Sequence, residues 1–354
     1  MRRRLTTVYA VLCTLLFAAG FVAVFYFAWQ KGVDEGISAL AYFAVSLFLA
    51  PFIHELGHAC FASAANMQIL YCKFFCFKIY RKKGKLKVGF ASPFAPEQTQ
   101  VIPKSGGHMK KRASAYTLGG LIFSGVFLAL ILTPAIWLAC IGHFKGSLFG
   151  LVPYTGYLFL LNILPVEYAG GKTDTLVFRG IKKGYDTEKV MLSAMEIQGE
   201  LYAGKSFAEI DEGLYFDLPQ LCEDEPLFAV ILDLRYRYFL EKEEYEKAAD
   251  CLNRLAQAQA YLTDSEVEKI AAELTYMHAL RGDLESAEES GKLCRGFLTE
   301  DTATAKRVLL AYSKLVGKTE AIEPLLQQAK DCLQWEIAGV AKAEGILLSR
   351  IENN

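Results

Sequence analysis

Acidic side chains are scarce in the first half of this chain. Residues 1–174 contain only six of its 39 Asp and Glu, at positions 34, 35, 55, 97, 167 and 174. Charged residues of either sign are absent from Ile37 to Ile53, and 53% of the 354 residues are hydrophobic. This composition is too apolar for an ordinary soluble enzyme, and it predicts that the first half of the chain lies in a membrane.

Four apolar stretches are near or above the roughly 20 residues that a membrane-spanning helix needs. They cover about residues 5–29, 37–66, 115–141 and 147–164. Three arginines precede the first stretch, as in a secretory signal peptide. That stretch is too long for a signal peptide and a second one follows closely, so we expect an uncleaved helix.

Basic residues indicate the orientation of these spans. The N-terminus carries Arg2, Arg3 and Arg4, and the loop 67–113 carries eleven Lys and Arg with Glu97 as its one acid. Positive loops favour the cytoplasmic side of a membrane. We therefore expect a multi-pass protein of the bacterial plasma membrane, with the N-terminus and the C-terminal domain in the cytoplasm.

Residues 67–90 predict a β-hairpin within the basic loop. Aromatic and β-branched residues flank the basic, glycine-containing turn at 81–84 on both sides. The mixture of Phe, Tyr and Lys suits a ribbon at the cytoplasmic membrane interface, in contact with the lipid bilayer. Prolines and the Gly106-Gly107 pair predict an irregular loop after it.

The C-terminal part is acidic and reads as successive amphipathic helices. Residues 175–354 hold 21 Lys and Arg against 33 Asp and Glu, so nucleic acid is not an expected partner. Similar segments recur with Ala248, Ala287 and Ala321 spaced 39 and 34 residues apart. This spacing resembles tetratricopeptide-type helix pairs, with an irregular helical bundle as the alternative. Either would offer a docking surface for a protein partner.

Together these features predict an all-α polytopic membrane protein with a small β-hairpin and a C-terminal helical, tetratricopeptide-like domain. We expect a transmembrane domain over residues 1–174, a linker with helical segments over 175–225, and a cytoplasmic helical-repeat domain over 226–354. Nine cysteines add no convincing disulfide framework, because several lie in spans and others are scattered through the part expected in the cytoplasm.

The second apolar stretch contains the motif His-Glu-Leu-Gly-His at residues 54–58. Positions i and i+4 share one face of a helix, so His54 and His58 can hold one metal ion. Glu55 can then act as general base. Ionisable residues inside a membrane span are costly and rare, which makes three of them in this order hard to explain as packing.

Catalytic zinc usually has three protein ligands, so a third must come from elsewhere in the chain. Asp34 and Glu35 are expected on the far side of the membrane, and Glu97 in the basic loop. Glu167 and Asp174, both just after the fourth stretch, remain as candidates.

A membrane-embedded HExxH motif followed by an Asn-x-x-Pro…Asp segment resembles the site-2 protease family of intramembrane zinc metalloproteases (peptidase family M50). The resemblance covers about residues 37–175 and implies one zinc ion per chain with Asp174 as the third ligand. It also implies support for substrate and oxyanion from a set of residues that comprises Asn162, Pro165, Gly119, Gly120 and Ser124.

This chain departs from the family pattern at two places. Eight residues separate Pro165 from Asp174, where the family has four, so Glu167 stays open as the third ligand. Ser124 occupies a place where the family has Asn, and its hydroxyl can still form a hydrogen bond.

The resemblance implies a zinc-dependent endopeptidase that hydrolyses peptide bonds of membrane-anchored protein or peptide substrates. In that mechanism Glu55 takes a proton from water activated by zinc and gives it to the leaving amine. The alternative is an inactive membrane scaffold whose helical domain recruits protein partners. A metal transporter is disfavoured because it would want acids or histidines on several spans.

Overall fold

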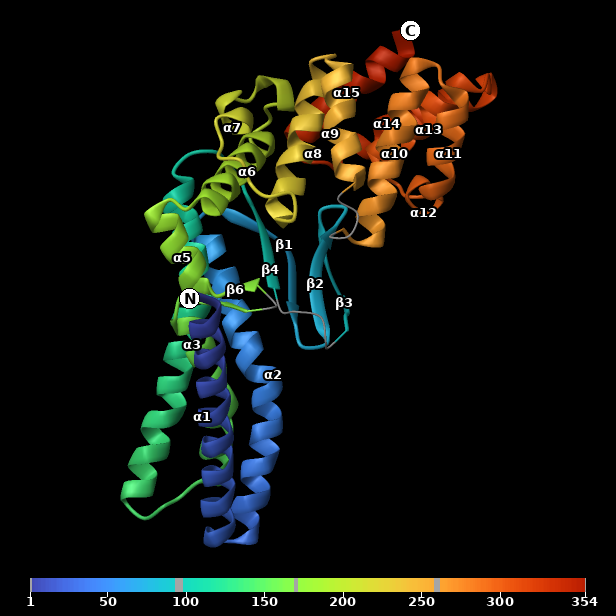
Figure 1. Cartoon of the computed structure of the whole chain (residues 1–354). Coiled ribbons are helices and arrows are strands. Elements are labelled where there is room, and N and C mark those ends of the chain that lie inside the picture. The colour runs from blue at the N-terminus through green and yellow to red at the C-terminus, as the bar shows by residue number, and fades with distance from the viewer. Residues whose placement is uncertain (1, 93–97, 169–170, 258–261, 354) are drawn as a thin grey trace. The chain divides into compact units, whose positions relative to one another are not determined.

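The computed structural model describes residues 2–92, 98–168, 171–257 and 262–353, and most of them are helical (Figure 1). The chain divides into two compact units. The first comprises residues 1–102 and 108–185, and the second comprises 103–107 and 186–354.

Four helices of the first unit are long and apolar enough to cross a membrane. They are α1 (Arg2–Lys31), α2 (Val33–Ala64), α3 (Met109–Cys140) and α4 (Gly146–Ile163). Their apolar side chains are largely exposed, as for Val22 at 64% and Leu130 at 68%. A surface of this kind matches hydrocarbon rather than water, so it indicates a membrane protein. The side of the membrane that each end faces stays a prediction.

Close approach between helix backbones holds this bundle together. Helix α2 packs against α1, α3 and α4. A Cβ atom on Gly57 of α2 would lie 2.3 Å from the carbonyl oxygen of Gly119 in α3, and one on Gly150 of α4 would lie 2.3 Å from that of Ala39. Only glycine allows such contacts, and small residues serve this purpose in membrane helices generally.

The segment between α2 and α3 forms a four-stranded sheet with the strand order β3-β2-β1-β4. Its strands are β1 (Met67–Phe74), β2 (Phe77–Lys82), β3 (Lys85–Phe90) and β4 (Gln98–Pro103). The predicted hairpin is confirmed in β2 and β3, which pair antiparallel around Lys83 and Gly84. Both of these residues have positive φ, as a two-residue type I′ turn requires. Strand β4 lies where the sequence predicted an irregular loop.

Two short strands and a helix complete the first unit. Strands β5 (Glu167–Tyr168) and β6 (Gly171–Lys172) pair antiparallel, and α5 (Asp174–Lys183) follows directly.

The second unit is helical throughout its described residues from 186 onward, apart from the connections. Its elements are α6 (Asp186–Tyr202), the 3₁₀ turn η1 (Phe207–Glu209), α7 (Gly213–Phe216), α8 (Pro226–Glu241), α9 (Tyr245–Gln257), α10 (Asp264–Arg281), α11 (Leu284–Leu293), α12 (Arg295–Leu298), α13 (Ala303–Leu315), α14 (Thr319–Leu333) and α15 (Ala338–Asn353). Two clusters of buried apolar side chains form its core, one around Tyr236 and Leu252 and one around Ile197 and Tyr215.

The three similar sequence segments each form the second helix of a packed pair. The pairs are α8 with α9, α10 with α11, and α13 with α14. The expected helices are therefore present, whereas the tetratricopeptide-type arrangement stays a prediction.

A buried ionic cluster joins several of these helices. Arg307 of α13 is fully buried and contacts Glu273 of α10 at 2.9 Å and Glu344 of α15 at 2.7 Å. Its guanidinium also lies 4.0 Å from the ring centre of Tyr276.

Candidate metal centre

The two histidines of the HExxH motif lie one turn apart on α2, as their spacing predicts. Their Nε2 atoms are 3.3 Å apart. Oδ2 of Asp174 lies 3.3 Å from Nε2 of His54 and 3.3 Å from Nε2 of His58. Three potential ligand atoms thus form a nearly equilateral triangle, drawn from α2 and from the first residue of α5.

This triangle fits a tetrahedral metal ion. Ligand atoms about 2.0–2.1 Å from a tetrahedral zinc ion lie roughly 3.3–3.4 Å from one another. Oδ2 of Asp174 is also buried without a hydrogen-bond partner among the described residues. A buried carboxylate oxygen is costly unless a hydrogen bond or a cation satisfies it, so the donor set is suited to a divalent cation.

Each histidine is held in place through its other ring nitrogen. Nδ1 of His58 lies 2.9 Å from the carbonyl oxygen of Tyr116, which can only accept, so Nδ1 carries the proton and Nε2 has a free lone pair. Nδ1 of His54 lies 3.0 Å from Oγ of Ser124. Such contacts fix the tautomer and ring orientation of metal-binding histidines. Ser124 therefore takes part in a hydrogen bond despite the absence of the family's Asn.

The Gly119-Gly120 pair allows α3 to approach these rings. A Cβ atom on Gly120 would lie 2.4 Å from Nε2 of His58 and 2.7 Å from Cε1 of His54. Contacts below 3.0 Å would force the rings to move. Gly120 thus leaves room for the two imidazole rings, and Gly119 allows α3 to pack closely against α2.

The approach of Asp174 depends on how the chain leaves α4. That helix ends at Ile163 because the next residue, Leu164, precedes Pro165 and is extended, with φ −98° and ψ 146°. Thr173 then closes the following loop, since its N–H donates to the carbonyl of Val166 at 3.1 Å and its hydroxyl donates to that of Leu164 at 2.8 Å. The loop that starts at Val166 therefore returns to Val166 at Thr173. Asp174 reaches the histidines although eight residues separate it from Pro165.

Helix α5 begins at Asp174 because Thr173 caps it. The Thr173 hydroxyl accepts from the N–H of Leu176, which satisfies a free donor of the first turn. The Thr175 hydroxyl donates to the carbonyl of Asn162 at 2.6 Å and ties α5 to the end of α4.

Glu167, the alternative third ligand, is exposed on β5. The described residues that can hold a metal ion together are His54, His58 and Asp174 alone.

Glu55 is buried next to the triangle, and a residue of the sheet holds it. Thr99 of β4 donates from Oγ1 to Oε2 of Glu55 at 2.5 Å. The carbonyl of Thr99 in turn accepts a hydrogen bond from the Tyr116 hydroxyl. Neither Thr99 nor Tyr116 was a sequence candidate, because the approach of β4 to α2 has no local sequence signal.

A cavity of about 390 Å³ adjoins these groups, and His54, Glu55, His58 and Asp174 line it. Its apolar lining comprises Pro51, Leu158 and Val177. Its further polar lining comprises Gln98, Thr99, Tyr116, Thr117, Asn162 and Lys172. Asn162, predicted to support substrate, thus lines the cavity, whereas Pro165 lies in the connection that follows α4 and is not among the lining residues.

Comparison with protein-family models, with curated proteins and with solved structures found no match to this chain.

Proposed function

We propose that this chain is an intramembrane zinc metalloendopeptidase of the site-2 protease type, which hydrolyses peptide bonds of membrane-anchored proteins. The observation that carries the proposal is the triangle of His54, His58 and Asp174 ligand atoms, 3.3 Å on each side, with Glu55 lining the same cavity. Two neutral imidazoles and one carboxylate leave a fourth tetrahedral position open, as catalytic zinc sites do.

A bound zinc ion supplies a Lewis acid that polarises a carbonyl and makes water nucleophilic at neutral pH. Glu55 takes one proton from the attacking water and passes it to the amide nitrogen as the C–N bond breaks. Oε2 of Glu55 accepts a hydrogen bond from the Thr99 hydroxyl, so Oε1 is the oxygen that takes up this proton. The products are a carboxylic acid and an amine.

The sheet supports a peptide substrate. A helical substrate hides its carbonyls in i→i−4 hydrogen bonds and must become extended before it can react. Strand β4 is an outer strand of the sheet, and its residues Gln98 and Thr99 line the cavity. An extended substrate segment that pairs with an outer strand is held by main-chain hydrogen bonds.

Zinc content of the full chain in detergent tests the proposal. We expect about one zinc per chain, retained in Glu55→Gln and lost in His54→Ala and Asp174→Ala. Glu167→Ala is the matched control, since it removes an acid of the same loop that lies outside the triangle. Cleavage of a membrane-anchored reporter should occur with the wild type and be abolished in Glu55→Gln. A wild type without bound zinc would contradict the proposal and favour the scaffold.

A further inference from the structure

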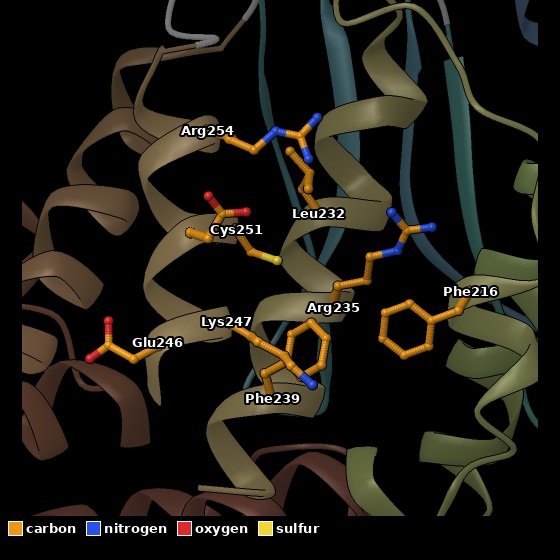
Figure 2. Close-up of a pocket in the computed structure, with 9 residues that line it drawn as sticks. Phe216, Leu232, Arg235, Phe239, Glu246, Lys247, Cys251 and Arg254 are labelled. Carbon is orange, nitrogen blue, oxygen red and sulfur yellow. The ribbon is translucent and has the colours of Figure 1, made fainter. Parts of the chain in front are cut away.

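A groove of about 450 Å³ lies along α8 and α9 of the second unit, beside Phe216 of α7 (Figure 2). Leu232, Phe239 and Cys251 contribute apolar surface to it. The basic side chains that line it are Arg235, Lys247 and Arg254. This combination is unusual for a unit in which acids greatly outnumber bases.

Aromatic rings support all three cations. The Arg235 guanidinium lies 5.3 Å from the ring centre of Phe216, and the Lys247 ammonium 5.3 Å from that of Phe239. Arg254 lies 5.1 Å from the ring centre of Phe228. A cation over an aromatic face is oriented by the ring and keeps its N–H groups available for an anion.

Arg235, which is half-buried, differs from Arg237 and Arg307 of this unit in its charged partners. Its Nε donates to the carbonyl of Tyr215 at 2.8 Å, but none of the described carboxylates lies within ion-pairing distance of it. By contrast, Arg237 contacts Asp233 at 3.0 Å, and Arg307 contacts two glutamates. Figure 2 shows the Arg235 guanidinium beside the Phe216 ring.

The surroundings of Arg235 leave its charge incompletely compensated. Burial lowers the pKa of the Arg235 guanidinium below its ordinary value; Cys251 opposes this shift, and the charge of Arg254 adds to it. Taking a charge out of water is costly unless an opposite charge accompanies it. An anionic group that enters the groove would supply that charge.

The two acids that line the groove do not fill this role. Glu246 is paired with Arg281 at 2.9 Å, and in Figure 2 its carboxylate points away from Arg235. Asp250 is exposed on α9. Lys247 and Arg254 already have partners, in Glu244 and Glu223, but these pairs are largely exposed and hold their partners weakly.

We propose that this groove binds an acidic peptide segment of a protein partner. A carboxylate of that segment accepts hydrogen bonds from the Nη groups of Arg235, with Arg254 beside it. A neighbouring apolar side chain of the segment lies on Leu232 and Phe239. A peptide fits better than a nucleic acid, because the acidic surface of the unit repels a long polyanion and the groove has apolar walls. This inference does not depend on protease activity.

Fluorescence anisotropy with the full chain in detergent tests the proposal. The probe is a fluorescein-labelled mixture of octapeptides that carry Asp or Glu next to Leu or Phe, compared with the same mixture carrying Asn or Gln. We expect saturable binding of the acidic mixture alone, weakened about tenfold or more in Arg235→Gln. Phe216→Ala should weaken it less, because it removes only the support beneath Arg235.

Arg295→Gln is the matched control, since it removes the same charge at an exposed position of α12 outside the groove. Circular dichroism melts establish that each variant is folded. Equal binding by Arg235→Gln and the wild type would overturn the proposal, as would equal binding of the acidic and amide mixtures or no saturable binding. Binding of a single-stranded oligonucleotide in place of the peptides would overturn the peptide as occupant.

Discussion

The hydroxyl of Thr99 donates to Oε2 of Glu55 across 2.5 Å, which joins an outer strand of the sheet to the C-terminal half of α2, a helix long and apolar enough to cross a membrane. Residues 44 positions apart are thereby coupled at the group that we assign as general base. The contact orients Glu55 without touching the metal ligands, so its loss should separate catalysis from metal binding.

Thr99→Val keeps the shape of the side chain and removes the hydrogen bond. We expect zinc content to stay the same and kcat for reporter cleavage to fall roughly 10–100-fold, because a hydrogen bond to a charged group is lost. Thr99→Ser restores the hydroxyl and should restore most of the rate and the wild-type pH profile. If the serine variant were as slow as the valine variant, the hydroxyl would have no positioning role.

Gly120→Ala should expel the metal. The new methyl group would lie 2.4 Å from Nε2 of His58, so the imidazoles must move apart from their present spacing. We expect zinc per chain, measured by atomic emission, to fall well below the wild-type value. Gly156→Ala is the control, because a Cβ atom at that glycine of α4 meets nothing within 4 Å. If Gly120→Ala kept its full zinc content, α3 would have moved away from the imidazoles and the prediction would be wrong.

Ser124→Ala should weaken zinc binding without abolishing it. The change removes the partner of Nδ1 of His54, and loss of such an orienting contact typically lowers metal affinity about 10–100-fold. Competition with a graded series of chelators measures the change. Ser63→Ala, which removes an exposed hydroxyl of α2, should match the wild type.

Arg307→Met should destabilise the second unit by about 3–5 kcal/mol, because it leaves two buried glutamates without their cation. Thermal unfolding in detergent, with amide hydrogen exchange in α10 and α13 as the local readout, measures the effect. Arg295→Met, at an exposed position, should change stability by no more than about 0.5 kcal/mol. If Arg307→Met lost no more stability than Arg295→Met, the ionic cluster would contribute little to the stability of the second unit.

The same cluster should make the second unit sensitive to acid. Burial raises the pKa of the Glu273 carboxyl, but Arg307 and Arg237 outweigh burial and hold the pKa below its ordinary value of 4.5. The folded state therefore binds fewer protons than the unfolded state, and the stability from Glu273 is present above about pH 4.5 and lost as pH falls below it. A series of melts from pH 7 to below pH 4 should show this loss, most of it below about pH 4.5. In Arg307→Met, burial raises the pKa of Glu273 without Arg307 to oppose it. The loss of stability at low pH should therefore be smaller than in the wild type, or should become a gain.

Local patterns were enough to predict much of this protein. The apolar stretches, the hairpin turn at Lys83-Gly84 and the amphipathic helices depend on contacts within a few residues. The placement of His54 and His58 on one face is likewise a property of helical periodicity. These features need no knowledge of distant parts of the chain.

Only the tertiary structure shows that Asp174, and not Glu167, lies beside His54 and His58. Both follow α4 closely, and the choice depends on Thr173, which closes the loop and starts α5 with Asp174 facing the histidines. Thr99 at Glu55, the glutamates around Arg307 and the groove at Arg235 also arise from segments far apart in sequence. The sequence by itself determined the helices and the HExxH face, because these follow from backbone periodicity and side-chain hydrophobicity. Packing decided which polar groups meet, because contact between distant segments depends on how whole elements dock.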